Sequence, residues 1–289
     1  MRYVLGVDAV EEPEDIFEID AASKGTLIHG VLEDLVNQVI EAQRDLAGWT
    51  DDDRATLTAI AEHHFAEAEA QGITGRELLW RRDRARILGE LDAILDQDDE
   101  RLGEGWRPVA TEERFGPVPV TLPSGHELHL NGSIDRVDRR PDGSLAVLDY
   151  KTGSKRSYMG LSPEEPHGHG TKLQLWVYAV AAEHTHQTGL PVTAGYWFTR
   201  DGEVVGYELN PEVADRITIA VDTIVESIAS GVFPARPSDP PSWHFIDCDY
   251  CRPDGLAATD RRREWERKRV DPALVAYATF CGEVTVDDA

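Results

Sequence analysis

Cysteine and long apolar runs are both scarce in this 289-residue sequence. The three cysteines are an odd number, and the opening residues MRYVLGVDAVEEPED contain no apolar run long enough for a secretion signal, so a disulfide framework is not expected. No stretch reaches the roughly 20 apolar residues that a membrane-spanning helix needs. We therefore expect a cytoplasmic protein without a membrane partner.

Basic side chains are also few: the sequence has 29 Lys and Arg residues but 54 Asp and Glu residues, which gives a net charge of -25. Proteins that hold nucleic acid normally neutralise phosphates with Lys and Arg, so the chain as a whole would repel DNA. Any nucleic-acid binding must depend on local basic patches, on a divalent metal ion or on a basic partner. The stretches RRDRAR (81–86) and RRREWERKR (261–269) are either such patches or solvated helix faces.

A phosphate loop of the form G-x-x-x-x-G-K-[ST] is absent, as is any internal repeat, so the chain has no sign of a nucleotide-driven motor of its own. The apolar share of 41% is ordinary for a globular protein, and the length allows a substantial core. We expect one mixed domain over residues 1–289.

Apolar spacing predicts a helical portion at about 23–100. The segment SKGTLIHGVLEDLVNQVIEAQR has apolar residues near helical spacing, with Ser23 as the expected N-cap. Two acidic, Ala-rich segments at about 51–71 and 75–97 also fit helices, and LGEGWRP closes this portion.

The period changes at about residue 105, where an α/β portion is expected to begin and to extend to about residue 232. Three segments predict strands that form an antiparallel meander: PVATEERFG, HELHLNGSIDRVDRR and SLAVLDYKT. A helix, two strands and a helix begun by Pro211 are expected to follow: TKLQLWVYAVAAEHTH, TAGYWFTR, EVVGYEL and PEVADRITIAVDTIVESIAS.

The stretch SLAVLDYKTG, residues 144–153, ends a buried strand in two charges. Alternate side chains of a strand share a face, so Asp149 and Lys151 are expected on one side and Tyr150 on the other. The short PDGS turn lets Asp135 of the preceding strand approach Asp149. Two carboxylates at a partly dry strand end repel each other unless a cation lies between them, and oxygen ligands favour magnesium or manganese.

A lysine beside such an ion could orient a water molecule or stabilise charge on a phosphate oxygen. These are the parts of phosphodiester hydrolysis. The alternative is a plain ion pair between Asp149 and Lys151 at the end of a strand.

The motifs around this strand resemble those of the PD-(D/E)XK nuclease superfamily, in particular the RecB and AddB type of nuclease domain. GSIDRVDRRPDGSLAVLDYKTG and QLWVYA match the patterns G-x-(I/V)-D-R-x-D, D-Y-K-T-G and Q-L-x-x-Y, and GTLIHGVLE is similar to the G-x-x-x-H element. The resemblance covers about residues 25–200, and GVFPARP with the tail extends it to about 270. It implies an α/β fold with a restriction-endonuclease-like core, in which helices flank a central mixed sheet, and an added N-terminal helical subdomain.

The resemblance also implies the residues of the site. Asp135 and Asp149 would bind Mg2+ or Mn2+, the backbone carbonyl of Tyr150 would be a further ligand, and His29 would supply a nitrogen ligand from its helix. Lys151 would be the catalytic lysine.

By the same resemblance Gln174 and Tyr178 would flank the site, and their i and i+4 spacing puts both on one helix face. They could fix Lys151 or a DNA phosphate, and the alternative is that they pack the helix on the sheet. Glu112, in EERF, resembles the E-x-x-F position and is expected behind the metal ligands or on the substrate side. Asp138 is expected outside the ligand set, paired with one of three arginines: Arg136, Arg139 or Arg140.

The remaining histidine pairs are expected on the surface or in loops rather than on a metal, although the PHGHG loop could border a DNA channel. These pairs are His63 with His64, His167 with His169, and His184 with His186.

The tail at about 233–289 resembles a degenerate iron–sulfur staple of AddB-type nucleases. In that pattern a third cysteine follows C-x-x-C after five residues, but here Ala257 stands at that position and only Cys248 and Cys251 remain. Two thiolates cannot complete a four-thiolate site, so no iron–sulfur cluster is expected. The tail is expected to pack through Trp243, Phe245 and Trp265. The alternative is zinc held by the two cysteines, Cys281 and a histidine such as His244.

The function implied is a metal-dependent DNA nuclease, an exonuclease rather than an endonuclease, that processes DNA ends in recombination and repair. The chain would be the nuclease module of a larger helicase-nuclease, with single-stranded or duplex DNA ends and a helicase as partners. One alternative is a free-standing exonuclease similar to the RecB-like proteins of CRISPR adaptation, whose iron–sulfur staple should be intact. The other is a catalytically silent scaffold that binds DNA or a helicase, in which Lys151 would have no use.

Overall fold

The computed structural model describes residues 17–234 and 258–282. By their contacts the described residues form two compact units, one ending at Thr218 and one beginning at Ile219. The expected single domain over residues 1–289 stays a prediction.

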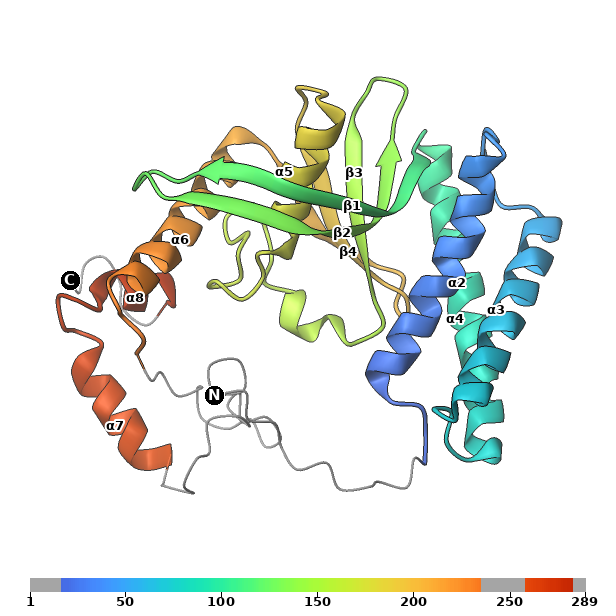
Figure 1. Cartoon of the computed structure of the whole chain (residues 1–289), viewed down its shortest axis with the longest axis horizontal. Helices are drawn as coiled ribbons and strands as arrows, with labels where there is room; N and C mark the ends of the chain where they lie inside the picture. The colour runs from blue at the N-terminus through green and yellow to red at the C-terminus, as the bar shows by residue number, and fades with distance from the viewer. Residues whose placement is uncertain (1–16, 235–257, 283–289) are drawn as a thin grey trace. The chain divides into compact units, whose positions relative to one another are not determined.

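Three helices form the N-terminal part of the first unit and lie beside one another in Figure 1. They are α2 (Ala21–Glu41), α3 (Asp51–Gln71) and α4 (Glu77–Gly103). Apolar side chains from all three helices meet in one buried cluster, which also contains Leu148, Tyr150 and Trp197 from the sheet. Burial of this shared face holds the helical portion against the strands.

The N-cap of α2 is Asp20 and not Ser23, so that prediction was wrong. The Asp20 carboxylate accepts hydrogen bonds from the backbone N–H groups of Ala22 and Ser23, each at 2.9 Å, and the Ser23 hydroxyl donates to it at 2.5 Å. A carboxylate at this position satisfies two free N–H groups of the first turn, and Ser23 becomes a helical residue.

A five-stranded mixed sheet follows in the order β1-β2-β3-β4-β5. The strands are β1 (Arg107–Thr121), β2 (Glu127–Arg139), β3 (Leu145–Lys151), β4 (Val192–Phe198) and β5 (Val204–Leu209). Neighbouring strands are antiparallel except β3 and β4, which are parallel. The predicted three-stranded meander is therefore confirmed, and so is the central mixed sheet flanked by helices.

The parallel step from β3 to β4 passes through the short helix η1 (Lys155–Tyr158) and α5 (Gln174–His186). A parallel connection needs such a crossover, and α5 packs on the sheet. Every residue of β3 from Leu145 to Tyr150 is buried, because the helical portion and α5 cover opposite faces.

A buried ion network joins α4 to β2. The guanidinium of Arg136, 1% exposed, donates two hydrogen bonds of 2.9 Å to Asp98 and one of 2.7 Å to Asp138. Asp138 also accepts from Arg101 at 2.9 Å. The expected pairing of Asp138 with Arg136 is confirmed, whereas the contributions of Asp98 and Arg101 were not foreseen.

The second unit contains the rest of α6 (Pro211–Ala229), α7 (Ala258–Lys268) and α8 (Val275–Phe280). Trp265 is buried there with Ala278, and the centre of its ring lies 6.0 Å from that of the Tyr277 ring. Cys281 is buried and free. The other tail predictions fall on Trp243, His244, Phe245, Cys248, Cys251 and Ala257, which lie outside the described residues.

Within residues 17–234 and 258–282, every helix falls short of the combined length and apolarity that a membrane span requires.

Candidate active site

The predicted acidic pair lies where β2 and β3 run side by side. The register pairs Arg136 with Leu148, which brings Asp135 level with Asp149 one position further on. The backbone N–H of Tyr150 donates to Asp135 Oδ2 at 2.9 Å and fixes that carboxylate. The short turn between two antiparallel strands is thus enough to bring together acids that are 14 residues apart in the sequence.

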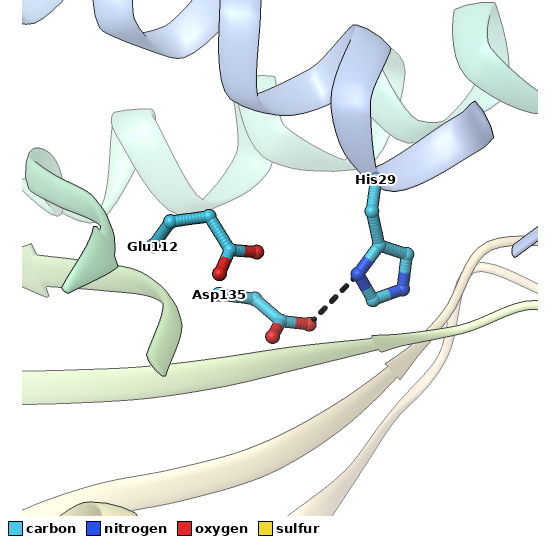
Figure 2. Close-up of side chains that lie close together, drawn as sticks. All are labelled: His29, Glu112 and Asp135. Carbon is cyan, nitrogen blue, oxygen red and sulfur yellow. Dashed lines mark ion pairs between the residues drawn. The ribbon is translucent and has the colours of Figure 1, made fainter. Parts of the chain in front are cut away.

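Glu112 lies on the other side of Asp135, on β1. The pairs Thr111–Arg136 and Glu113–Ile134 flank it in the ladder, so Glu112 is level with Asp135. Its φ of 42° is a left-handed conformation that side-chain-bearing residues rarely adopt in a strand. In Figure 2 its carboxyl group lies near that of Asp135. Ser133 Oγ donates to Glu112 Oε2 at 2.9 Å.

His29 reaches this group from α2. Its Nε2 lies 2.8 Å from the carbonyl oxygen of Tyr150, which can only accept, so Nε2 carries a proton. Nδ1 then faces Asp135 Oδ2 at 3.3 Å, the contact drawn in Figure 2. The hydrogen bond to Tyr150 therefore fixes the ring so that Nδ1 faces the acid.

The ligand atoms of His29, Glu112 and Asp135 all lie within 4.8 Å of one another, and no other group of this kind occurs in the part of the chain that the structure describes. One nitrogen and two carboxylates suit Mn2+ or Mg2+. The 3.3 Å between Nδ1 and Oδ2 is near the spacing of about 3 Å expected for adjacent ligands of an octahedral ion. The donor set fits a divalent metal.

Asp149 lies outside this three-residue group, and its Oδ2 forms an ion pair with Lys151. The expected further ligand, the Tyr150 carbonyl, accepts the hydrogen bond from His29. The structure therefore brings His29, Asp135 and Glu112 together most closely, with Asp149 and Lys151 beside them. The assignment of individual ligands stays a prediction.

Burial raises the affinity of both acids for protons. Burial, and next the charge of Asp149, raise the pKa of Asp135 to about 6. Burial also raises the pKa of Asp149, although Lys151 and His29 act in the opposite direction. The site thus has more negative charge than its own cations offset, which a divalent ion would relieve.

Lys151 is held by α5 as well as by Asp149. Its ammonium donates to Gln174 Oε1 at 3.3 Å, and Gln174 Nε2 donates to the Tyr178 hydroxyl at 2.8 Å. The rings of Tyr178 and Phe115 are in T-shaped contact with their centres 6.2 Å apart, and burial raises the pKa of Tyr178. Gln174 therefore contacts Lys151 directly, Tyr178 contacts Gln174, and their roles at the site stay predictions.

Five histidines of the three predicted pairs have carboxylate neighbours. His64 Nε2 lies 2.8 Å from Asp34, His63 lies 3.4 Å from Glu67, and His186 lies 3.1 Å from Glu113. In the PHGHG loop, Glu165 lies 3.0 Å from His167 and 3.7 Å from His169.

Sequence reasoning missed the buried network behind the site. Its signal is an acid in an apolar stripe: α4 buries Leu91, Ile94, Leu95 and Leu102, and Asp98 occupies the same face at helical spacing. A buried acid requires a cationic partner, which Arg136 supplies from the residue next to Asp135.

Known proteins share this sequence pattern. The model of the PD-(D/E)XK nuclease superfamily matches residues 1–254. The chain is similar to AddB, a subunit of the ATP-dependent helicase/deoxyribonuclease, of Lacticaseibacillus casei (strain BL23), at 28% identity over 69% of this chain and 18% of that protein. The protein of the same name from Bacillus anthracis is 27% identical over 60% of this chain and 16% of its own length.

A third protein of that name, from Streptococcus agalactiae serotype Ia, is 32% identical over 57% of this chain and 14% of its own length. The chain thus spans less than a fifth of the length of these relatives. With a family match over most of its residues, the chain belongs to the PD-(D/E)XK nuclease superfamily, as its RecB- and AddB-type motifs predicted.

Proposed function

We propose that the chain is a metal-dependent deoxyribonuclease that hydrolyses phosphodiester bonds. The observation that carries the proposal is the convergence of His29, Asp135 and Glu112 within 4.8 Å beside the Lys151–Gln174 pair. The names of its relatives, which all describe one subunit of an ATP-dependent helicase/deoxyribonuclease, support the same activity.

His29, Asp135 and Glu112 would hold the ion, with Asp149 close by. Bound Mg2+ or Mn2+ would supply charge neutralisation at the scissile phosphate and lower the pKa of a water molecule. The Lys151 ammonium would donate a hydrogen bond to the phosphate or orient the attacking water. Gln174 and Asp149 would keep that ammonium in place, so that little reorganisation is needed during reaction.

Within this function we place the chain as an exonuclease that processes DNA ends in recombination and repair, beside or fused to a helicase that delivers the strand. Single-stranded or duplex ends would be its substrates. The acidic composition supports dependence on such a partner, because a net charge of -25 opposes unaided capture of DNA.

Purified protein incubated with 5′- and 3′-labelled single-stranded and duplex DNA tests the proposal. We expect cleavage with Mn2+ or Mg2+, none with EDTA, and a loss of about 10²- to 10³-fold in Lys151→Ala because charge on the phosphate is no longer stabilised. Asp149→Ala should also lose activity. Lys155→Ala, which removes a lysine already paired with Glu203, is the matched control and should retain it.

The products distinguish the modes of cutting, since an exonuclease releases short products from one labelled end and an endonuclease gives internal fragments. Binding of DNA without any metal-dependent cleavage would contradict the proposal and favour the catalytically silent scaffold.

A further inference from the structure

Among residues 17–234 and 258–282, one lysine beside the candidate active site lacks an acidic partner. The chain has five lysines, and four of them form ion pairs: Lys24 with Glu90, Lys151 with Asp149, Lys155 with Glu203 and Lys268 with Glu264. Within the described residues, Lys172 has no carboxylate at ion-pair distance. In a protein with nearly twice as many acids as bases, an unpaired and partly buried lysine is a site where an anion would be stabilised.

Lys172 is held in a defined position. Its ammonium lies over the ring of Tyr158 at 4.0 Å from the ring centre, a cation–π contact. Its stem packs on Gly168, where a Cβ atom would come within 2.9 Å of Lys172 Cγ. Gly168 has a φ of 51°, and the backbone N–H of Lys172 donates to the His167 carbonyl at 3.0 Å. The PHGHG turn thus shapes the seat of this lysine.

Two aromatic rings lie between Lys172 and Lys151 of the candidate active site. The centres of the Tyr158 and Tyr196 rings are 4.7 Å apart, and the Lys151 ammonium lies 5.2 Å from the centre of the Tyr196 ring. Tyr196 itself pairs with Asp149 in the β3–β4 ladder. Two lysines therefore lie on two touching tyrosine rings, one at the site and one beyond it.

The two ammonium groups are near enough to influence each other. Burial, and next the charge of Lys151, lower the pKa of Lys172. Asp149 offsets the charge of Lys151, whereas no described carboxylate offsets that of Lys172. The positive charge that the described residues leave uncompensated is therefore that of Lys172.

We propose that Lys172, seated on Tyr158, binds a backbone phosphate of the DNA strand next to the phosphate that is cleaved. This inference rests on the proposed nuclease function. A lysine acts as a point charge for phosphate without regard to base sequence, and Tyr158 limits the positions that the ammonium can take. In a chain that otherwise repels DNA, such a contact aligns the strand with the reactive centre.

The test is the salt dependence of kcat/KM for a single-stranded oligonucleotide with saturating Mn2+. Each lost phosphate contact lowers the slope of log(kcat/KM) against log[KCl] by about 0.7 for single strands. We expect this decrease in Lys172→Met, with kcat changed less than about twofold, and a restored slope in Lys172→Arg. Lys155→Met removes the same charge from a lysine paired with Glu203 and should leave the slope unchanged.

A substrate variant locates the contact. When one phosphate next to the cleaved bond is replaced by an uncharged methylphosphonate, kcat/KM should fall for the unaltered protein and not fall further in Lys172→Met. Parallel salt plots for Lys172→Met and the unaltered protein would overturn the inference and leave the nuclease proposal intact. Absence of metal-dependent cleavage by the unaltered protein would overturn both.

Discussion

Asp135→Asn is expected to abolish metal-dependent cleavage and, at the same time, to raise the melting temperature of the metal-free protein. Burial and the charge of Asp149 raise the pKa of Asp135 to about 6, from an ordinary value of 3.8. The ionised carboxylate is therefore destabilising in the folded, metal-free chain. An amide of the same shape removes that charge and can still accept the hydrogen bond from Tyr150 N–H.

The gain in stability should depend on pH. Asp135 binds its proton more tightly in the folded than in the unfolded state. Its contribution to the stability of the folded protein is therefore lost as pH rises from about 4 through about 6. The advantage of Asp135→Asn should therefore be full near pH 7.5, on the order of 1 to 3 kcal/mol or a few degrees, and small near pH 4.

Thermal unfolding in EDTA at both pH values measures this effect. Asp142→Asn is the control: Asp142 accepts a hydrogen bond from Ser144 N–H in the β2–β3 turn, and its hydrogen bonds lower its pKa, so no gain is expected. A lower melting temperature for Asp135→Asn at pH 7.5 would mean that this acid supports the fold rather than a metal.

Arg136→Met is expected to destabilise the protein by about 3 to 5 kcal/mol, the usual effect of removing one partner from a buried ion network. The side chain is 1% exposed and neutralises both Asp98 and Asp138. Without it, two acids remain buried, and only Asp138 keeps a cationic partner, Arg101. Urea denaturation measures the difference.

Two comparisons separate the network from the loss of a single charge. Arg216→Met breaks an exposed pair with Glu212 and should change stability by less than about 1 kcal/mol. Arg136→Met combined with Asp98→Asn removes the acid that is left without a cationic partner and should recover part of the loss. A change in Arg136→Met no larger than in Arg216→Met would contradict the account of the network.

The three-stranded meander and the approach of Asp135 to Asp149 followed from the sequence because both depend on local rules. Alternation within β3 put Asp149 and Lys151 on one face, and a short turn brought Asp135 level with Asp149. The i and i+4 spacing likewise predicted that Gln174 and Tyr178 act together.

Other features depend on tertiary contacts that periodicity does not encode. Glu112 itself adopts a left-handed backbone conformation within β1, and its carboxylate lies close to His29 and Asp135. No rule of composition predicts this conformation in a strand. Asp98 pairs with Arg136 across 38 residues, and the Lys172 ammonium lies over the ring of Tyr158, the last residue of η1. The N-cap of α2 was misassigned because Asp20 and Ser23 are both good capping residues, and contacts with the N–H groups decide between them.

In the proposed enzyme, helix α2 and strands β1 and β2 together supply one divalent-ion site. Mn2+ binding, followed by electron paramagnetic resonance, tests this most directly. The account predicts one tightly bound ion per chain, with nitrogen hyperfine coupling from one imidazole. His29→Ala should remove that coupling and weaken binding by at least about tenfold, whereas His63→Ala, which alters an exposed histidine near Glu67, should change neither. Unchanged Mn2+ affinity and an unchanged spectrum in His29→Ala would contradict the account.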